Sequence, residues 1–278
     1  ALVADSRNEV VVSAPFGNSS GSGDATVMQD PPPICAGGTG DGTEAAMQSG
    51  YAVHLERPGH RGPHLRTLAG RAALVVTEDM PVEPLRSWTR ALSRGLDTPI
   101  VSVDSACVVP MQLVGRAYER AFAFRQATSG LRSERLPRTR CQIDSAFDSY
   151  VPNDLPLEPI DLLTAEIAEL VSQCEIDHSI GPAAHTVGGS TAGYERWNLF
   201  KKQGLSQYAR LRNNALIDGV SRMSPYLHYG MVSPMRIARE AAEIGNQGAE
   251  KYLDELLIWR ELAYTFCFYR SDHERTTA

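Results

Sequence analysis

Two groups of residues in the second half of the chain have types and spacing that could do chemistry. Glu255 and Trp259 lie four residues apart in the segment 253–269, which is apolar nearly all round. This spacing places both side chains on one face of a helix, and a helix with no wide polar face is typical of the interior of a helical domain. A carboxylate beside a partly exposed indole would line a pocket for a flat, hydrogen-bonding ligand. The alternative is that Glu255 pairs with an arginine from elsewhere in the fold and that Trp259 is plain core.

The second group is a hydroxyl-rich turn that runs into a helix, with the sequence Ser221-Arg222-Met223-Ser224-Pro225. Ser221 and Ser224 each offer a hydroxyl and a backbone N–H, and Pro225 suits the first helical position. A helix start with free N–H groups and hydroxyls suits an anion such as a pyrophosphate. An ordinary capped helix is the alternative.

The elements that must position these groups follow from hydrophobic patterning. Alternating strands and helices over 51–104 predict a parallel α/β sheet with right-handed crossovers. The expected strands cover 51–55, 72–77 and 100–104, and the expected helices cover 63–70 and 84–95. Asp79 and Asp104 lie at the ends of two of these strands, where ligands often bind in such sheets, with helix capping or loop polarity as the alternative role.

The pattern over 116–125 predicts a further helix that faces the sheet. The second half of the chain is predicted to be helical, with helices over 159–173, 193–207 and 253–269. The polar, proline-containing stretch between the helices over 116–125 and 159–173 reads as an interdomain linker. Residues 1–50 are rich in Gly, Ser and Pro and predict a poorly ordered extension, with one short strand over 8–14.

The composition is that of an ordinary globular protein, with 42% hydrophobic residues, 22% charged residues and a formal net charge of −6. The net charge does not indicate nucleic-acid binding, but it can hide a local basic patch. Residues 116–140 contain seven arginines and two glutamates. This basic run is typical of a solvated face or linker, with DNA contact as the alternative.

The cysteine pattern and the hydropathy indicate the cellular compartment in which the protein would reside. The five cysteines are scattered and form no C-x-x-C pair. This pattern predicts a reducing compartment, with neither a disulfide framework nor a zinc site. No apolar run approaches the length of a membrane span, and no secretory signal opens the sequence. We therefore expect a protein of the cytoplasm or nucleus with no membrane contact.

Three separated segments, in this order and spacing, resemble the flavin-binding domain of the DNA photolyase and cryptochrome family. They are YARLRN at 208–213, SRMSPYLHYG at 221–230 and LDELLIWRELAYTFCFY at 253–269. The amino-acid sequences of these segments are most similar to those of class II-type cyclobutane pyrimidine dimer photolyases. The resemblance is clear over 175–274 and continues more weakly back to residue 51, where TEDMPVEPLRSW and VDSACVVP are similar to segments of the family's front domain.

The resemblance implies a fold of two classes, α/β followed by all-α. Residues 51–126 would form a partial, Rossmann-like antenna domain with a parallel sheet, and 127–158 would form the linker. Residues 159–278 would form the first half of a helical FAD-binding domain. Because the family's helical domain continues beyond the point where this sequence stops, we expect a fragment that binds flavin poorly and repairs nothing alone.

The resemblance also implies a function, the light-driven repair of pyrimidine dimers in DNA by an electron from excited reduced FAD. Glu255 would hydrogen-bond the bases of the dimer and Trp259 would stack on them, with the protein acting as a monomer. Five residues would hold the phosphates or ribityl chain of FAD: Tyr208, Ser221, Arg222, Met223 and Ser224. The resemblance allows an antenna chromophore of unspecified identity and calls for no metal. The alternatives are a cryptochrome-like photoreceptor without repair activity and a non-catalytic adaptor.

Overall fold

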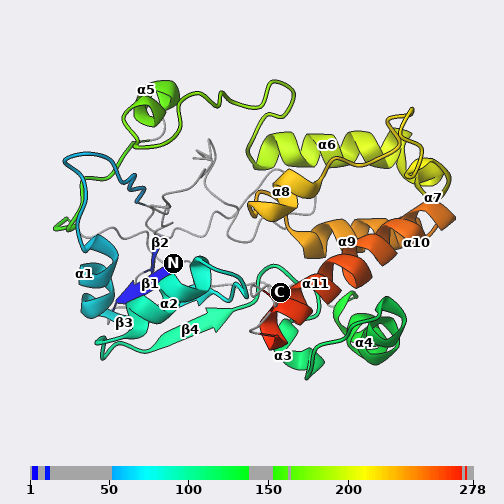
Figure 1. Ribbon diagram of the computed structural model, residues 1–278, viewed down its shortest axis with the longest axis horizontal. Helices are drawn as coiled ribbons and strands as arrows, with labels where there is room; N and C mark the ends of the chain where they lie inside the picture. Colours follow the sequence, from blue (N-terminus) through cyan, green and yellow to red (C-terminus); the bar gives the residue numbers. More distant parts are fainter. Residues whose placement is uncertain are drawn as a thin grey trace, which may run out of the picture.

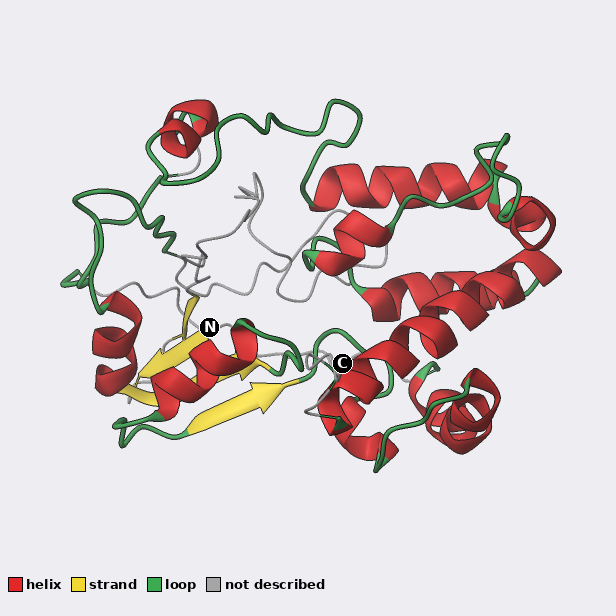
Figure 2. Ribbon diagram, in the orientation of Figure 1, coloured by secondary structure: helices red, strands yellow, loops and turns green. Residues whose placement is uncertain are grey.

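A computed structural model describes residues 2–5, 10–12, 52–137, 153–161, 164–270 and 273 (Figure 1). Figure 2 shows the strands gathered in one part of the molecule and most of the helices in the other. This division agrees with an α/β part followed by a helical part. The predicted domain boundaries remain predictions.

The sheet contains four strands in the order β2-β1-β3-β4. Their bounds are β1 Leu2–Asp5, β2 Val10–Val12, β3 Ala72–Glu78 and β4 Ile100–Val103. The expected parallel pair is confirmed, with Val75 of β3 opposite Ile100 of β4. The expectation of a purely parallel sheet is wrong, because β1 pairs antiparallel with β3 and β2 pairs antiparallel with β1. A hairpin from the first residues of the chain therefore completes the sheet.

Two expectations about the N-terminal half concern strands. The short strand expected over 8–14 is confirmed as β2, and most of the remaining extension lies outside the described residues. The strand expected over 51–55 is wrong in its described part, where Val53 forms only an isolated antiparallel bridge to Ile160. Its bridge partner, Ile160, belongs to none of the four strands of the sheet, so the described part of this segment pairs outside the sheet.

Four helices accompany the sheet or follow it. They are α1 His64–Arg71, α2 Leu85–Ser93, α3 Met111–Val114 and α4 Ala121–Arg135. The first two confirm the expected helices, and α1 buries Leu68 and Ala69 against Val75 of β3. The helix expected over 116–125 instead begins at Ala121 and continues into the residues assigned to the linker. The helix can extend this far because it contains no proline; the first proline after it, Pro137, comes two residues beyond its end.

The helical part is built around one buried cluster that includes Trp197, Tyr252 and Leu256. Its helices are α5 Ile167–Ser172, α6 Ser190–Gln203, α7 Tyr208–Leu211, α8 Ser224–His228, α9 Pro234–Ile244, α10 Gln247–Asp254 and α11 Arg260–Tyr269. The helix expected over 193–207 is confirmed as α6 followed by a short 3-10 turn at Leu205–Gln207. The helix expected over 159–173 is reduced to α5, which buries none of its residues and so lacks the packing that would extend it.

The loop after β4 is attached to α11 through a buried carboxylate. Glu261 is 1% exposed, and its two oxygens accept the N–H groups of Val108 at 2.7 Å and Val109 at 3.3 Å. Within the loop, Asp104 accepts the N–H groups of Cys107 at 2.9 Å and Met111 at 2.8 Å. Asp104 therefore has the capping role that the sequence left as an alternative. The result is a fixed connection between the sheet and the helix that follows Trp259.

The pKa of Glu261 is raised to about 8, because burial of the carboxylate outweighs the two N–H donors that favour its charged form. Since this folded-state pKa lies above the unfolded value of 4.5, the folded protein holds a proton between these values that the unfolded chain has released. The stabilisation by this group is present below the unfolded pKa and is lost as pH rises toward the folded pKa.

We predict that Glu261→Gln weakens the dependence of stability on pH. Between pH 5 and pH 8 the wild type should lose on the order of 3 kcal/mol more free energy of unfolding than the variant, since one pKa unit corresponds to about 1.4 kcal/mol. Urea titrations at the two pH values measure this difference. Exposed Glu243, changed to Gln, is the control and should retain the wild-type dependence. Equal pH dependence of Glu261→Gln and wild type would contradict the assignment.

A second constraint is the close approach of α10 to the preceding turn. A Cβ atom added at Gly248 would lie 1.8 Å from the carbonyl oxygen of Leu205, which is backbone and cannot rotate away. A Cβ atom at Gly130, inside α4, would meet nothing within 4 Å. The two glycines therefore provide a matched pair, one required by packing and one not.

We predict opposite effects of alanine at these two positions. Gly248→Ala should destabilise the fold by about 2 kcal/mol or more through overpacking, whereas Gly130→Ala should stabilise it by roughly 0.5–1 kcal/mol through helix propensity. Urea denaturation of both variants measures the effects. A Gly248→Ala variant as stable as the wild type would show that α10 does not approach the backbone of Leu205 this closely.

Candidate functional site

The candidate site lies on the longest helical stretch of the chain, which runs from α10 to α11 through a π-helical turn at Glu255–Trp259. The expected helix over 253–269 is confirmed, and it begins earlier because the Asn246 side chain caps α10 by accepting the N–H of Ala249. Single π-helical turns inside α-helices often occur at functional sites. Here the turn starts at Glu255 and ends at Trp259, the two residues predicted to contact a substrate.

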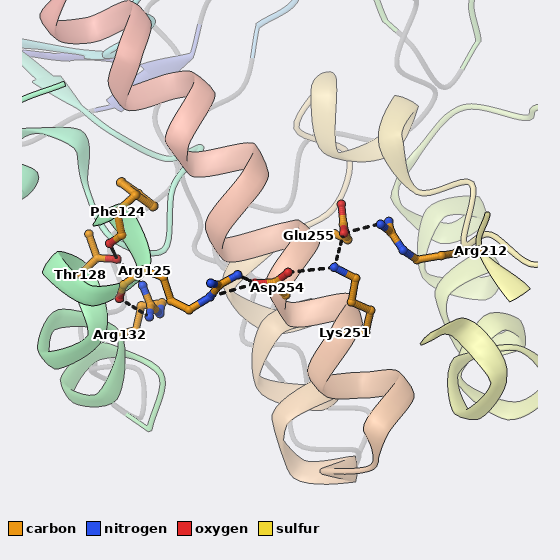
Figure 3. A network of polar contacts seen from close by, with 8 residues as sticks. All are labelled: Phe124, Arg125, Thr128, Arg132, Arg212, Lys251, Asp254 and Glu255. Carbon is orange, nitrogen blue, oxygen red and sulfur yellow. Dashed lines mark hydrogen bonds and ion pairs between the residues drawn. The ribbon is translucent and has the colours of Figure 1, made fainter. Parts of the chain in front are cut away.

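The carboxylate of Glu255 is held between two cations (Figure 3). Its Oε1 atom lies 2.8 Å from Nη1 of Arg212 and 2.8 Å from Nζ of Lys251. The side chains of Arg212 and Glu255 are 24% and 26% exposed, so the pair is neither fully buried nor fully solvated. The hydrogen bond to Glu255, followed by that to Asp254, raises the pKa of Lys251, which keeps the ammonium charged. Glu255 therefore does pair with an arginine, as the alternative interpretation expected, but its side chain remains partly exposed.

The ion pairs continue beyond Glu255 toward α4. Lys251 also lies 2.9 Å from Asp254, and Asp254 pairs with Arg125 of α4. Burial would raise the pKa of Asp254, but the bonds from Arg125 and Lys251 outweigh it and lower that pKa. The basic run of the sequence is therefore used partly inside the fold, and Arg135 likewise donates to the carbonyl of Val108.

Trp259 is 51% exposed at the end of the π-helical turn. This exposure excludes the alternative that Trp259 is plain core. Trp side chains are normally largely buried, so this exposure leaves the side chain unusually accessible to a partner. The structure therefore places a charged carboxylate and an accessible ring on the same turn.

The turn that precedes α8 has an unusual backbone. Arg222 has a φ of 56°, a left-handed conformation that non-glycine residues adopt rarely and often at functional sites. The hydroxyl of Ser221 accepts the N–H of Met223 at 3.3 Å, and its carbonyl accepts Nε–H of Arg196 at 3.0 Å. Ser224 is the first residue of α8 and is exposed, so Pro225 falls one position later than expected. No side chain caps this helix.

Two of the five predicted FAD contacts belong largely to the core. Met223 is 1% exposed, and Tyr208 is 8% exposed with its ring in edge contact with Phe200 and Tyr252. The guanidinium of Arg212 lies 5.9 Å from the centre of the Tyr208 ring. Ser221, Arg222 and Ser224 remain at the surface, so the structure separates three accessible positions from two that support them.

Sequence reasoning did not assign roles to Arg212 and Lys251, which hold the carboxylate of Glu255. Lys251 precedes Glu255 by four residues, a spacing that indicates a helical ion pair and could have found it. Arg212 comes from another element, so only the segment match at 208–213 pointed toward it. Among the described residues, no three potential ligands from His, Cys, Asp and Glu gather as a metal site. In the same part of the chain, no helix has both the length and the apolar character needed to span a membrane.

Comparison with known proteins places this geometry in context. No protein-family model matches the chain. The sequence is 27% identical over 207 residues to a deoxyribodipyrimidine photo-lyase of Methanothermobacter thermautotrophicus, covering 74% of this chain and 43% of that protein. It is 38% identical over 219 residues to the deoxyribodipyrimidine photo-lyase of Oryza sativa subsp. japonica, covering 73% of this chain and 41% of that protein.

Among solved structures, a cryptochrome of Synechocystis superposes with a TM-score of 0.55 at 20% identity, covering 79% of this chain and 46% of that one. The chain thus has the photolyase and cryptochrome fold. Together with the sequence matches, this confirms the resemblance: the chain is a homologue of the deoxyribodipyrimidine photolyases. It spans less than half of the length of the curated relatives described above, 43% and 41%.

We predict that Arg212 and Glu255 are energetically coupled. In a double-mutant cycle with Arg212→Gln and Glu255→Gln, the coupling free energy should be about 1–2 kcal/mol, because the pair is partly shielded from water. Arg222 and Asp218 form a comparable pair with side chains 62% and 56% exposed and serve as the control. Their coupling should be at most about 0.5 kcal/mol. Equal coupling in both cycles, measured by urea denaturation, would contradict the shielding of Glu255.

Proposed function

We propose that this chain is part of a class II-type photolyase that repairs cyclobutane pyrimidine dimers in DNA. The observation that carries the proposal is that Glu255 and Trp259 begin and end one π-helical turn, with the carboxylate of Glu255 2.8 Å from Arg212 and Trp259 51% exposed. The two curated relatives described above are both named deoxyribodipyrimidine photo-lyases, which supports the same activity. The scattered cysteines support a reducing compartment, the cytoplasm or nucleus, and the protein would act there as a monomer.

Glu255 would recognise the bases of the dimer. An ionised carboxylate can only accept hydrogen bonds, and pyrimidine dimers offer ring N–H donors. Arg212 and Lys251 form ion pairs with this carboxylate and offset its negative charge. This neutralisation also limits repulsion between Glu255 and the phosphates of DNA, because opposite charges at 2.8 Å largely cancel at longer range.

Trp259 would stack on the dimer after it has turned out of the duplex. Stacking on an aromatic ring contributes about 1–3 kcal/mol per base. A dimer distorts the duplex, so turning it out costs less than for an intact pair. The exposed indole face is suited to this contact because no rearrangement of the described core is needed to reveal it.

The surface residues of the turn before α8 fit the phosphate end of FAD. Ser221 and Ser224 bring hydroxyls, Arg222 brings a guanidinium, and the uncapped first turn of α8 leaves N–H groups for an acceptor. Tyr208 and Met223 would support this end from the core. Reduced FAD, when bound and excited by light, supplies the electron that opens the cyclobutane ring.

The α/β part would carry an antenna chromophore. A cavity of about 220 Å³ lies beyond the ends of β3 and β4, where ligands bind in parallel sheets. Asp79, Arg86 and Phe268 are among the residues that line it.

The proposal predicts selective binding of damaged DNA that depends on the two site residues. The whole photolyase of which we propose this chain to be a part, reconstituted with FAD, should bind an oligonucleotide with one pyrimidine dimer more tightly than the undamaged oligonucleotide. Trp259→Ala and Glu255→Gln should each weaken this binding by about tenfold or more, corresponding to the loss of one stacking contact or one charged hydrogen bond. Fluorescence anisotropy measures the affinities, and illumination of the complex tests repair.

Glu243→Gln provides the control, since Glu243 is exposed and lies on α9. Flavin binding without any preference for damaged DNA would overturn the repair proposal and favour a photoreceptor of the cryptochrome type. A folded protein that binds no flavin and no damaged DNA would favour the adaptor.

A further inference from the structure

A groove lies between α4 and the helix that carries Glu255. Its volume is about 320 Å³, at the lower end of the range of roughly 300–1,000 Å³ for small-molecule sites. Residues of α4 line one side, and residues of α10 and the π-helical turn line the other. None of the residues predicted to contact the dimer or FAD lines this groove, so it is a separate candidate site.

The apolar part of the groove is continuous with the core. Leu257 and Ile258 are 4% and 3% exposed, and Leu136 and Leu253 pack against the core cluster to which Leu257 belongs. The carbonyl of Leu136 accepts Nε–H of Arg239 at 2.9 Å, which fixes the end of α4 beside the groove. These side chains offer an apolar surface for a ligand of modest size.

The charged part of the groove contains a cation without an anionic partner (Figure 3). Nη1 of Arg132 donates to Oγ1 of Thr128, and Nη2 of Arg132 donates to the carbonyl of Arg125 at 2.9 Å. Thr128 is 1% exposed and donates to the carbonyl of Phe124, so the guanidinium rests on a fixed support. These contacts use two of its five N–H donors. Within the part of the chain that the structure describes, Arg132 forms no ion pair.

The carboxylates near Arg132 are engaged elsewhere or exposed. Asp254 pairs with two other cations, Glu261 accepts two backbone N–H groups, and Glu250 is exposed. Burial is the largest cause of the lowered pKa of Arg132, and a half-buried cation is stabilised by an anion that bonds to it. An anion with an apolar body would therefore match both parts of the groove.

We propose that this groove binds a small organic anion, with its anionic group on Arg132 and an aromatic or short aliphatic body on the leucine-lined side. This inference is independent of the proposed function, because it uses none of the residues assigned to the dimer or to FAD. The remaining N–H donors of Arg132 would bind the anionic group, a pairing for which the planar guanidinium is well suited. A bound ligand would join α4 to the helix that carries Glu255.

The test uses two fluorescent probes, 8-anilinonaphthalene-1-sulfonate and N-phenyl-1-naphthylamine, which has the same rings without the sulfonate. The wild type should bind one molecule of the sulfonate per chain, about tenfold more tightly than the neutral probe, because the sulfonate adds a charged hydrogen bond. Arg132→Gln should weaken binding of the sulfonate about tenfold and leave binding of the neutral probe unchanged. Ser133→Phe should weaken binding of both, because exposed Ser133 lines the groove and a phenyl ring would occupy it.

Arg94→Gln and Ser93→Phe are the matched controls, because both residues are exposed at the end of α2. Both variants should bind the two probes as the wild type does, and circular dichroism checks that every variant is folded. Equal affinity of the wild type for the two probes, or equal weakening of both by Arg132→Gln, would overturn the proposal. Sulfonate binding that is lost in Arg222→Gln and retained in Ser133→Phe would place the probe at the turn before α8 and overturn it as well.

Discussion

The bond between the Glu261 carboxylate and the loop after β4 is the contact on which the arrangement of this protein depends. The carboxylate is buried and satisfies the N–H groups of Val108 and Val109. Sliding or rotating α11 against the loop would leave a buried polar group without its partners, and such a loss is costly. Because α11 continues through the π-helical turn into α10, this contact also determines where Glu255 and Trp259 lie relative to the sheet.

The same helix therefore exposes one side chain to solvent and buries another within three residues. Trp259 is half exposed, whereas Glu261, two residues later, is fully buried. Two helical steps of about 100° place these side chains on nearly opposite faces. The candidate site can face a partner while the opposite face fixes the helix to the sheet. Two charged side chains hold the carboxylate of Glu255, and Asp254 continues the network to Arg125 of α4. Part of the basic run, for which a solvated face or linker was expected and DNA contact was the alternative, therefore pairs within the fold.

Much of the local structure could be predicted from periodicity. The strands β3 and β4, their parallel pairing, the helices α1, α2 and α6, and the long final helix follow from apolar patterns that span whole elements. Two failures show that local preference alone does not decide the outcome. The described part of the segment 51–55 is partly buried but pairs only through an isolated bridge outside the sheet. The pattern over 159–173 has helical character, but α5 buries none of its residues.

For the candidate site, the sequence by itself determined the residue types and their spacing: a carboxylate and an indole four residues apart, a hydroxyl-rich turn upstream, and the three segments that identify the family. Only the tertiary structure decided which of these residues are accessible. It buried Tyr208 and Met223, left Trp259 half exposed, paired Glu255 with Arg212 and inserted the π-helical turn between the two site residues. The physical reason is that periodicity reports which face of an element is apolar, whereas burial and ion pairing depend on contacts between residues far apart in the sequence, here Arg212 with Glu255 and Val108 with Glu261.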